Sequence, residues 1–327
     1  MSELIRVENL CKAYPVRGSK DKTVQALDHI SLSIQKGETF GLVGESGSGK
    51  TTLGRTILRL VEPDSGKIIY DGTDITSGPM MPYRRKMQII FQNPAGSLDP
   101  SARVWQTIAE GLSVRYGNLS RKEKRERSAQ LLAEVGLQED ALDRFPSAFS
   151  GGQQQRIDIA RALSVEPEFI VCDEPVSALD VSYQAQIINM LVDLQDKRGL
   201  TYLFISHDLS VVMHISQRIG VMYQGRLVEI GSCEEIARHP AHPYTRMLME
   251  AIPVPDPKVA REKRAKKEAE EASFTVSLSD LSPDSLSKTA CPFYPRCRFR
   301  KDACLVHDPA LKTLSKDHAS TCVMGAN

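Results

Sequence analysis

The sequence lacks an apolar run of membrane-spanning length. A spanning helix needs about 20 consecutive apolar residues, and no stretch of the 327 residues approaches this. It also has almost no net charge, because 42 lysines and arginines are balanced by 41 aspartates and glutamates. This balance argues against nucleic acid or an anionic membrane surface as the default partner. The opening residues MSELIRVENLCKAY carry charges throughout and lack the apolar centre of a secretory signal, so we expect a cytosolic protein.

Cysteine is scarce and odd in number, with seven in the chain. In a reducing compartment an odd count argues against a disulfide framework. Four of the seven lie in the last forty residues, in the stretch that begins CPFYPRC. This tail is therefore a candidate metal site.

Short apolar runs alternate with helical patterns along the chain. They occupy residues 38–44, 86–92, 168–174 and 201–208, and runs of this length predict buried strands of a largely parallel α/β sheet. Polar helical segments replace strands over about 93–165, which predicts a helical subdomain inserted into the sheet core. We expect residues 1–252 to form one ordered unit, 253–288 a charged linker, and 289–327 a small four-cysteine module.

The stretch GESGSGKT follows one of these apolar runs and precedes a helical pattern. It matches the P-loop pattern G-x-x-x-x-G-K-[ST], in which backbone N–H groups surround phosphates, the lysine contacts the outer phosphates and the hydroxyl residue binds Mg²⁺. A glycine-rich turn that merely resembles a P-loop is the alternative. We expect ATP to contact Gly44, Glu45, Ser46, Gly47, Ser48, Gly49, Lys50, Thr51 and Thr52.

Polar side chains end the other apolar runs. Asp173 and Glu174 close the run FIVCDE, where an aspartate can bind Mg²⁺ and the following glutamate can act as general base toward water. Gln92 and His207 end two further runs, and ligands of parallel sheets bind at such carboxyl ends. We expect Gln92 to contact Mg²⁺ or the attacking water, and His207 to donate to the γ-phosphate.

The stretch FSGGQQQR offers a second anion-binding turn at a helix start. With the other motifs, in this order, it makes the chain resemble the ATP-binding cassette (ABC) family over about its first 250 residues. The resemblance implies the P-loop NTPase cassette fold, with a RecA-like core. It also implies head-to-tail pairing with a second cassette, each signature turn closing over the ATP of its partner. Residues expected to act in trans are Ser150, Gly151, Gly152, Gln153 and Asp180, and Tyr14 matches the aromatic that stacks on adenine, although it could be a core residue.

Further segments, among them FQNPAGSLDP and HPAHPYTRMLMEAIP, resemble ATPase subunits of bacterial oligopeptide and dipeptide importers, with TTLGR favouring the second of their two ATPases. The resemblance implies an Mg²⁺-dependent ATPase on the cytoplasmic face of the cell membrane. Its implied partners are a second ATPase subunit, two membrane permease subunits and, indirectly, an extracytoplasmic binding protein, with no nucleic acid. Gln154 departs from the arginine common at its position. Trp105 is either a permease anchor or subdomain core.

Other interpretations remain open. Importers of nickel, glutathione or other small solutes use similar ATPases, and the cassette does not touch the solute. A soluble ABC switch acting without transport is a second class, disfavoured by the near-neutral charge and the single cassette. A non-hydrolysing regulatory subunit is a third, disfavoured by the presence of Glu174 and His207.

The tail cysteines Cys291, Cys297, Cys304 and Cys322 have the spacing C-x5-C-x6-C-x17-C. Structural zinc usually uses pairs two to four residues apart, whereas iron–sulfur clusters are held by four cysteine thiolates. The tail also resembles the cysteine module that ends many peptide-importer ATPases and is associated with a [4Fe–4S] cluster. We therefore expect such a cluster, with zinc or unliganded thiols as alternatives.

Overall fold

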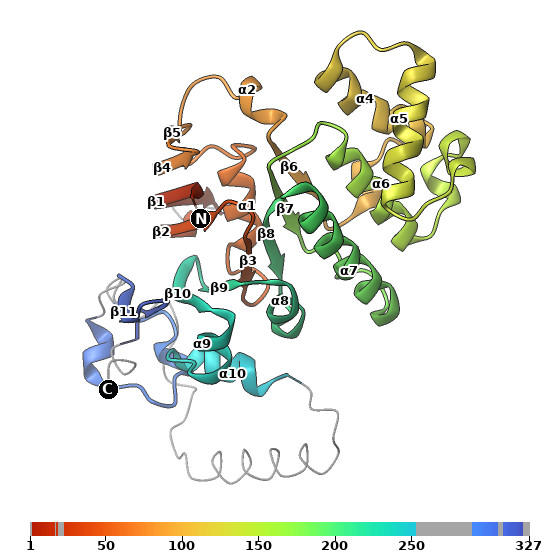
Figure 1. The fold of residues 1–327 in the computed structure, drawn as a ribbon. Coiled ribbons are helices and arrows are strands. Elements are labelled where there is room, and N and C mark those ends of the chain that lie inside the picture. The colour runs from red at the N-terminus through yellow and green to blue at the C-terminus, as the bar shows by residue number, and fades with distance from the viewer. Residues whose placement is uncertain (1, 17, 19–22, 253–289, 307–309, 323–327) are drawn as a thin grey trace, which may run out of the picture.

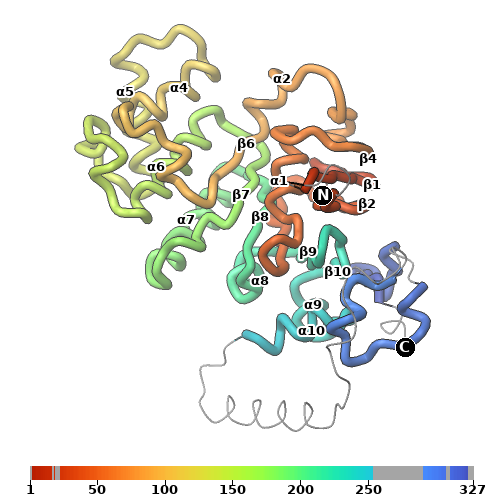
Figure 2. The backbone as a smooth tube through the Cα atoms, turned by 180° about the vertical axis from the view of Figure 1, so that it is seen from behind, coloured from red at the N-terminus to blue at the C-terminus, as the bar shows by residue number. Residues whose placement is uncertain are grey.

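The computed structural model describes residues 2–16, 18, 23–252, 290–306 and 310–322. Its centre is an eight-stranded sheet with the order β11-β12-β10-β9-β3-β8-β7-β6 (Figures 1 and 2). Parallel pairing joins its last five strands, which are β9 (Arg218–Tyr223), β3 (Thr39–Val43), β8 (Thr201–Ser206), β7 (Phe169–Asp173) and β6 (Met87–Ile90). Every residue of β3, β7 and β8 is buried, which explains their unbroken apolar runs. The four strands expected from the sequence are thus confirmed.

A second sheet of four antiparallel strands packs beside the first. Its order is β2-β1-β4-β5, with strands β1 (Glu3–Pro15), β2 (Thr23–Gln35), β4 (Ser65–Tyr70) and β5 (Thr73–Asp74). The sequence analysis did not anticipate this sheet. Its long strands β1 and β2 pair with several register shifts, which interrupt the period-two alternation that marks a half-buried strand.

Helices follow the ends of the parallel strands. Helix α1 (Lys50–Ile57) follows β3, α7 (Val181–Arg198) follows β7, and α8 (Leu209–Ile215) follows β8. The turns after these strands therefore meet at one edge of the sheet, which is where ligands bind in parallel α/β folds.

The helical segment between β6 and β7 forms the expected inserted subdomain. It contains α3 (Pro94–Ser97), α4 (Val104–Tyr116), α5 (Arg121–Glu134), the 3-10 helices η1 (Glu139–Asp143) and η2 (Pro146–Ala148), and α6 (Gly151–Leu163). These elements lie together beyond the β6 and β7 side of the sheet (Figure 1). Ser120 is the N-cap of α5, and its side chain and that of Glu123 cap each other's backbone N–H groups. The short helix α2 (Met81–Arg84) precedes β6.

The C-terminal part extends the main sheet with antiparallel strands. Strand β10 (Arg226–Ser232) pairs with β9, and helices α9 (Cys233–Arg238) and α10 (Pro243–Glu250) follow it. The expected linker 253–288 lies outside the described residues. Beyond it come η5 (Tyr294–Arg296), η6 (Asp302–Leu305), β11 (Lys312–Ser315) and β12 (His318–Ser320). Because β12 pairs with β10, the cysteine-bearing tail contributes strands to the main sheet.

The expected fold class, an α/β cassette with an inserted helical subdomain, is confirmed. The parallel core carries antiparallel strands at one edge. In the described part of the chain, no helix is both long enough and apolar enough to span a membrane.

Candidate active site

The P-loop joins β3 to α1, as the motif predicts. Two of its glycines are sterically required. A Cβ atom on Gly44 would lie 2.2 Å from the Met222 carbonyl oxygen, and one on Gly49 would lie 2.2 Å from that of Ala26. Gly49 also has φ +102°, which side-chain-bearing residues rarely adopt. The loop is therefore held against β2 and β9 in a shape that any larger residue would change.

Lys50 fills the centre of this loop. Its Nζ donates to the carbonyl oxygens of Gly44 at 2.7 Å and Glu45 at 2.9 Å. Burial lowers the pKa of Lys50, and the carboxylates of Glu174, Asp173 and Glu45 oppose that shift. Of the other expected contacts, Ser46 and Gly47 are exposed, Ser48 is buried and Thr52 is half-buried. The loop thus combines a central cation with exposed backbone at its tip.

Thr51 and Asp173 form a direct pair across two elements. The Thr51 hydroxyl, on the first turn of α1, donates to Asp173 Oδ1 at 2.7 Å. Asp173 ends β7 and is buried, and this burial raises its pKa despite the hydrogen bond from Thr51. Arg55 approaches the other carboxylate oxygen to 3.9 Å. Hydroxyl and carboxylate oxygens are the ligands that Mg²⁺ prefers.

Gln92, Glu174 and His207 converge beside that pair. Gln92 Nε2 lies 3.1 Å from Glu174 Oε2, and His207 Nδ1 lies 3.2 Å from the same oxygen. Glu174 has φ +49°, a conformation that is rare for glutamate and concentrates at functional sites. Its N–H donates to the Ile205 carbonyl oxygen at 3.0 Å, which supports the turn. Polar residues from two neighbouring strand ends therefore contact one carboxylate oxygen of Glu174.

The second anion-binding turn lies at the start of α6, where Ser150 and Gly151 are exposed. The Ser150 and Gln153 side chains cap each other's backbone N–H groups. Gln154 donates to the Pro146 and Phe149 carbonyl oxygens. Among the described residues no hydrogen bond links 150–153 to the P-loop, and α6 lies apart from α1 in both views (Figures 1 and 2).

Three further expected residues are placed by the structure. Asp180 caps α7 by accepting from the Tyr183 N–H at 3.1 Å. Tyr14, near the end of β1, has an exposed ring with Lys12 Nζ 5.7 Å from its centroid. Trp105 is buried in the core, yet one side lines a surface pocket of about 400 Å³ on α4 and α5. Its indole Nε1–H is buried and makes no hydrogen bond, so Trp105 is part of the subdomain core and also borders the pocket.

The four tail cysteines gather in one place. The Cys291 N–H donates to the Cys304 carbonyl oxygen at 2.8 Å. Burial raises the pKa of Cys291 and of Cys297 to about 11 each, and the neighbouring thiols add to both shifts. Cys291 interacts with all three others in this way, so the chain brings together residues spread over 32 positions.

The sequence analysis missed the contact between this module and the P-loop. Arg296, one residue before Cys297, donates to both carboxylate oxygens of Glu45 at 2.8 and 2.9 Å. Tyr244 OH accepts the Glu45 backbone N–H at 2.8 Å. The ion pair joins residues 251 positions apart, and no local pattern signals a contact over that separation.

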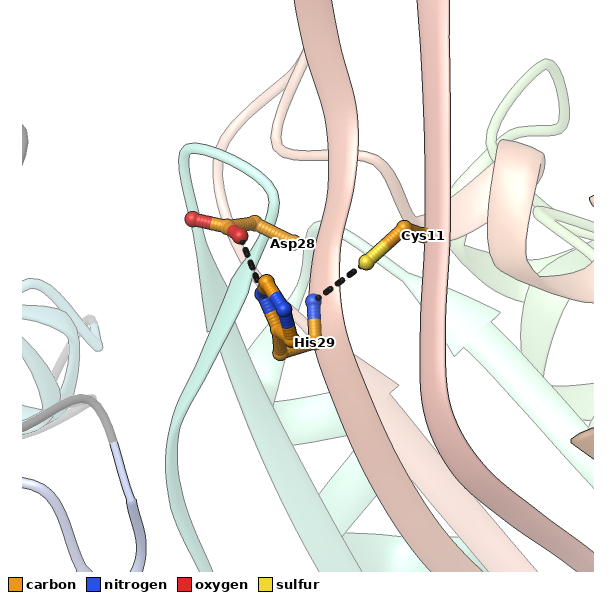
Figure 3. Close-up of side chains that lie close together, drawn as sticks. All are labelled: Cys11, Asp28 and His29. Atoms are coloured by element: carbon orange, nitrogen blue, oxygen red, sulfur yellow. Dashed lines mark hydrogen bonds and ion pairs between the residues drawn. The ribbon is translucent and has the colours of Figure 1, made fainter. Parts of the chain in front are cut away.

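A second group of potential metal ligands lies between β1 and β2 (Figure 3). Ligand atoms of Cys11, Asp28 and His29 lie within 4.8 Å of one another. These atoms already have partners: Asp28 pairs with Arg226 at 2.6 Å and with His29 at 2.7 Å, and Cys11 Sγ accepts the His29 N–H at 3.3 Å. Arg226 supplies the cation that Asp28 needs, so hydrogen bonding accounts for the group without a metal.

Comparison with known proteins agrees with this geometry. The ABC transporter family model matches residues 27–177, and the model of the oligopeptide/dipeptide transporter C-terminal region matches residues 228–304. A putative peptide import ATP-binding protein of Brucella ovis is 45% identical over 323 residues, covering 98% of this chain and 97% of that protein. The oligopeptide transport ATP-binding protein OppF of Bacillus subtilis is 52% identical over 243 residues, covering 73% of this chain and 80% of OppF.

A solved structure gives the same fold. The dimeric post-hydrolysis state of the ATP-binding cassette MJ0796, bound to ADP and Pi, superposes with a TM-score of 0.65 at 29% identity, covering 70% of this chain and 99% of that one. Family models, full-length relatives and fold thus agree. The chain belongs to the ABC transporter family, in the group of ATP-binding proteins that carry the oligopeptide/dipeptide transporter C-terminal region.

Proposed function

We propose that this chain is the ATP-hydrolysing subunit of a peptide importer. The observation that carries the proposal is the convergence at one sheet edge of Lys50 and Thr51 with Asp173 and Glu174. The cation and backbone of the P-loop suit the phosphates of ATP, and the carboxylate of Glu174 stands beside them. This set of groups is what hydrolysis of a terminal phosphate requires.

Each residue of the site has a separate role in the proposed reaction. Thr51, Gln92 and Asp173 would hold Mg²⁺, which when bound neutralises charge on the phosphate oxygens. Glu174 accepts the proton of the attacking water, and the contacts with Gln92 and His207 hold its carboxylate in place. His207 donates to the γ-phosphate, and Gln92 contacts either the Mg²⁺ ion or the attacking water. Exposed Tyr14 stacks on the adenine.

Hydrolysis needs a second cassette. The turn formed by Ser150, Gly151, Gly152 and Gln153 presents the backbone N–H groups of its two glycines at a helix start, while its other two N–H groups are capped by side chains. Among the described residues, the turn makes no hydrogen bond to the P-loop. The dimeric structure of the cassette MJ0796 supports pairing of two cassettes here. In the proposed pair, this turn and Asp180 face the ATP of the partner. The expected partner is the other ATPase subunit of a heterodimer.

The transport role follows from the group to which the chain belongs. Its relatives are peptide import and oligopeptide transport proteins, and the C-terminal family model covers residues 228–304. We therefore infer docking on two permease subunits at the cytoplasmic face of the bacterial membrane, with peptide delivered by an extracytoplasmic binding protein. A related importer of nickel, glutathione or another small solute is the second candidate.

The variant Glu174→Gln tests the hydrolytic assignment. The amide keeps the shape of the side chain but cannot accept a proton, so we expect ATP binding to persist while turnover falls by about 10²–10⁴-fold. Phosphate release and equilibrium ATP binding measure the two effects on the same preparation. Hydrolysis near the wild-type rate would show that another residue is the base.

We also propose that the four tail cysteines hold a [4Fe–4S] cluster. Four thiolates around one zinc ion, each at about 2.3 Å, lie within about 4 Å of one another. Among the described residues, no three of these sulfur atoms lie within 4.8 Å of one another, although all four interact. The sulfur atoms are thus spaced more widely than the ligands of one zinc ion. This spacing favours a multi-iron cluster held by four thiolates over a single zinc ion.

Metal analysis tests the cluster directly. Protein purified without oxygen should be brown and contain iron and sulfide, and its visible absorption should bleach on reduction. Cys297→Ser should remove the iron and spare ATP binding, with Cys233→Ser, a substitution outside the module, as the matched control. Colourless protein that contains zinc, or no metal, would contradict the proposal.

A further inference from the structure

The four-cysteine module is in direct contact with the P-loop. Arg296 ends η5, between Cys291 and Cys297, and its guanidinium makes two parallel hydrogen bonds to the Glu45 carboxylate. This two-point geometry is the strong form of an arginine–carboxylate pair. In both views the module lies beside β10, α9 and α10 (Figures 1 and 2). The tail, remote from the ATP motifs in sequence, thus reaches the first turn of the phosphate loop.

Aromatic packing fixes the position of Arg296. Phe293 packs edge-on against Tyr223 with centroids 5.3 Å apart, and lies 5.5 Å from Tyr244. The Arg296 guanidinium lies over the rings of both Phe293 and Tyr223. Tyr244 in turn accepts the Glu45 N–H, so both the backbone and the side chain of Glu45 are held by this cluster.

Glu45 needs such a partner because of where it lies. Its backbone oxygen accepts from Lys50 Nζ at 2.9 Å, and its carboxylate interacts electrostatically with the same ammonium group. A free carboxylate at this point would repel the phosphates of ATP and compete with them for Lys50. The hydrogen bonds from Arg296 hold the pKa of Glu45 below its ordinary value, as expected for a carboxylate committed to another partner.

We propose that Arg296 is a positioning residue for the P-loop: it holds the Glu45 carboxylate away from Lys50, so the docked four-cysteine module sets the affinity of the site for ATP. This inference rests on the proposed role of the P-loop in binding ATP, and it does not depend on which metal the cysteines hold. It makes the module a regulator of the nucleotide site rather than a remote appendage.

A double-mutant cycle on the full chain tests the inference, with the affinity for Mg-ATP measured by equilibrium binding. Arg296→Ala should weaken ATP binding by roughly fivefold or more, within the usual range of coupling between sites. Because the released Glu45 carboxylate is what weakens ATP binding, the double variant Glu45→Ala with Arg296→Ala should bind ATP as well as Glu45→Ala alone. Arg296→Lys keeps the charge but loses the two-point geometry, and should lie between wild type and Arg296→Ala.

The matched control is Arg300→Ala. Arg300 contacts the Pro295 carbonyl oxygen and the Tyr294 ring, within the module, and its loss should leave ATP affinity unchanged. The inference would be overturned if Arg300→Ala weakened ATP binding as much as Arg296→Ala, or if removing Glu45 as well did not restore ATP binding. Either result would mean that Arg296 only helps the module to fold. Wild-type protein that fails to bind ATP would instead refute the proposed function.

Reciprocity supplies a second readout that is independent of ATP affinity. If the docked module favours ATP, ATP must favour the docked module by the same factor. Hydrogen exchange of the η5 amides, followed by mass spectrometry, should therefore slow when Mg-ATP is added. The slowing should disappear in Arg296→Ala, and an equal effect of ATP in both proteins would overturn the coupling.

Discussion

Glu229 should be the residue on which attachment of the C-terminal module depends. It lies on β10 with its side chain fully buried. Its carboxylate accepts the N–H groups of Ala241 at 2.7 Å and His242 at 2.8 Å, and contacts His318 Nε2 of β12 at 2.6 Å. One side chain thus connects β10 to the turn before α10 and to β12, the last strand of the described chain.

The cost of removing it follows from those three contacts. A buried donor left without an acceptor costs about 1–3 kcal/mol, and removal of the Glu229 carboxylate leaves three groups without their acceptor or partner. Since water can enter the space left by truncation, we expect Glu229→Ala to destabilise the protein by about 3–5 kcal/mol. Glu229→Gln keeps one acceptor oxygen, and should cost about half as much.

The contribution of Glu229 also depends on pH. Burial raises its pKa, but the hydrogen bonds from His318, Ala241 and His242 outweigh that effect and hold the pKa below its ordinary value. A depressed folded-state pKa gives stability that is complete above the unfolded value, about 4.3 for glutamate. We therefore expect this stabilisation to be lost as the pH falls below about 4.3 through the folded-state pKa, and Glu229→Gln to lack that loss.

Urea titration followed by circular dichroism measures the stability, and hydrogen exchange of β12 amides reports the attachment itself. Glu234→Gln is the matched control, because Glu234 lies in the next element, 70% exposed, in an ion pair with Arg238. It should change stability by less than about 0.5 kcal/mol. If Glu229→Ala unfolds at the same urea concentration as Glu234→Gln, or β12 exchanges at the wild-type rate, the reasoning is wrong.

Two further predictions concern the nucleotide site. Gly49→Ala should abolish ATP binding and lower the melting temperature more than Gly37→Ala does. Both glycines have positive φ, but only at Gly49 would the new methyl group meet a backbone oxygen, at 2.2 Å. Equal effects of the two substitutions would exclude the clash as the cause. In dimers of separately tagged cassettes, Gly152→Asp should block hydrolysis of the ATP on the partner's P-loop, whereas Lys50→Ala should block hydrolysis on its own. If nucleotide analysis shows that both changes silence the same ATP, the trans arrangement is wrong.

The sequence analysis predicted those parts of the molecule in which the functional side chains and the secondary structure that positions them lie in one short segment. The P-loop is such a case, because its glycines, Lys50 and Thr51 are adjacent in the chain and lie between a strand and a helix. The apolar run ending in Asp173 is another, since a parallel strand buried on both faces reads as an unbroken apolar segment.

The features that escaped prediction depend on distant contacts. Strand β1 pairs with β2 and β4 through shifted registers, so its burial pattern has no clean period. The pairing of β12 with β10 and the contact of Arg296 with Glu45 join segments about 90 and 251 residues apart. Arg296 itself is one of several basic residues in the tail, and only packing against Phe293 and Tyr223 distinguishes it.

The separation of Arg296 from Glu45 has a consequence for synthesis of the protein. Ribosomes add about 5–20 residues per second, so the P-loop leaves the ribosome roughly 10–50 seconds before its arginine partner. During that interval the Glu45 carboxylate has no Arg296 to hold it, and β10 has no β12 beside it. The nascent cassette is therefore a weaker ATP binder than the finished one, and a chain truncated before Arg296 would retain that weakness permanently. ATP binding thus becomes strong only when the segment that carries Arg296 has docked.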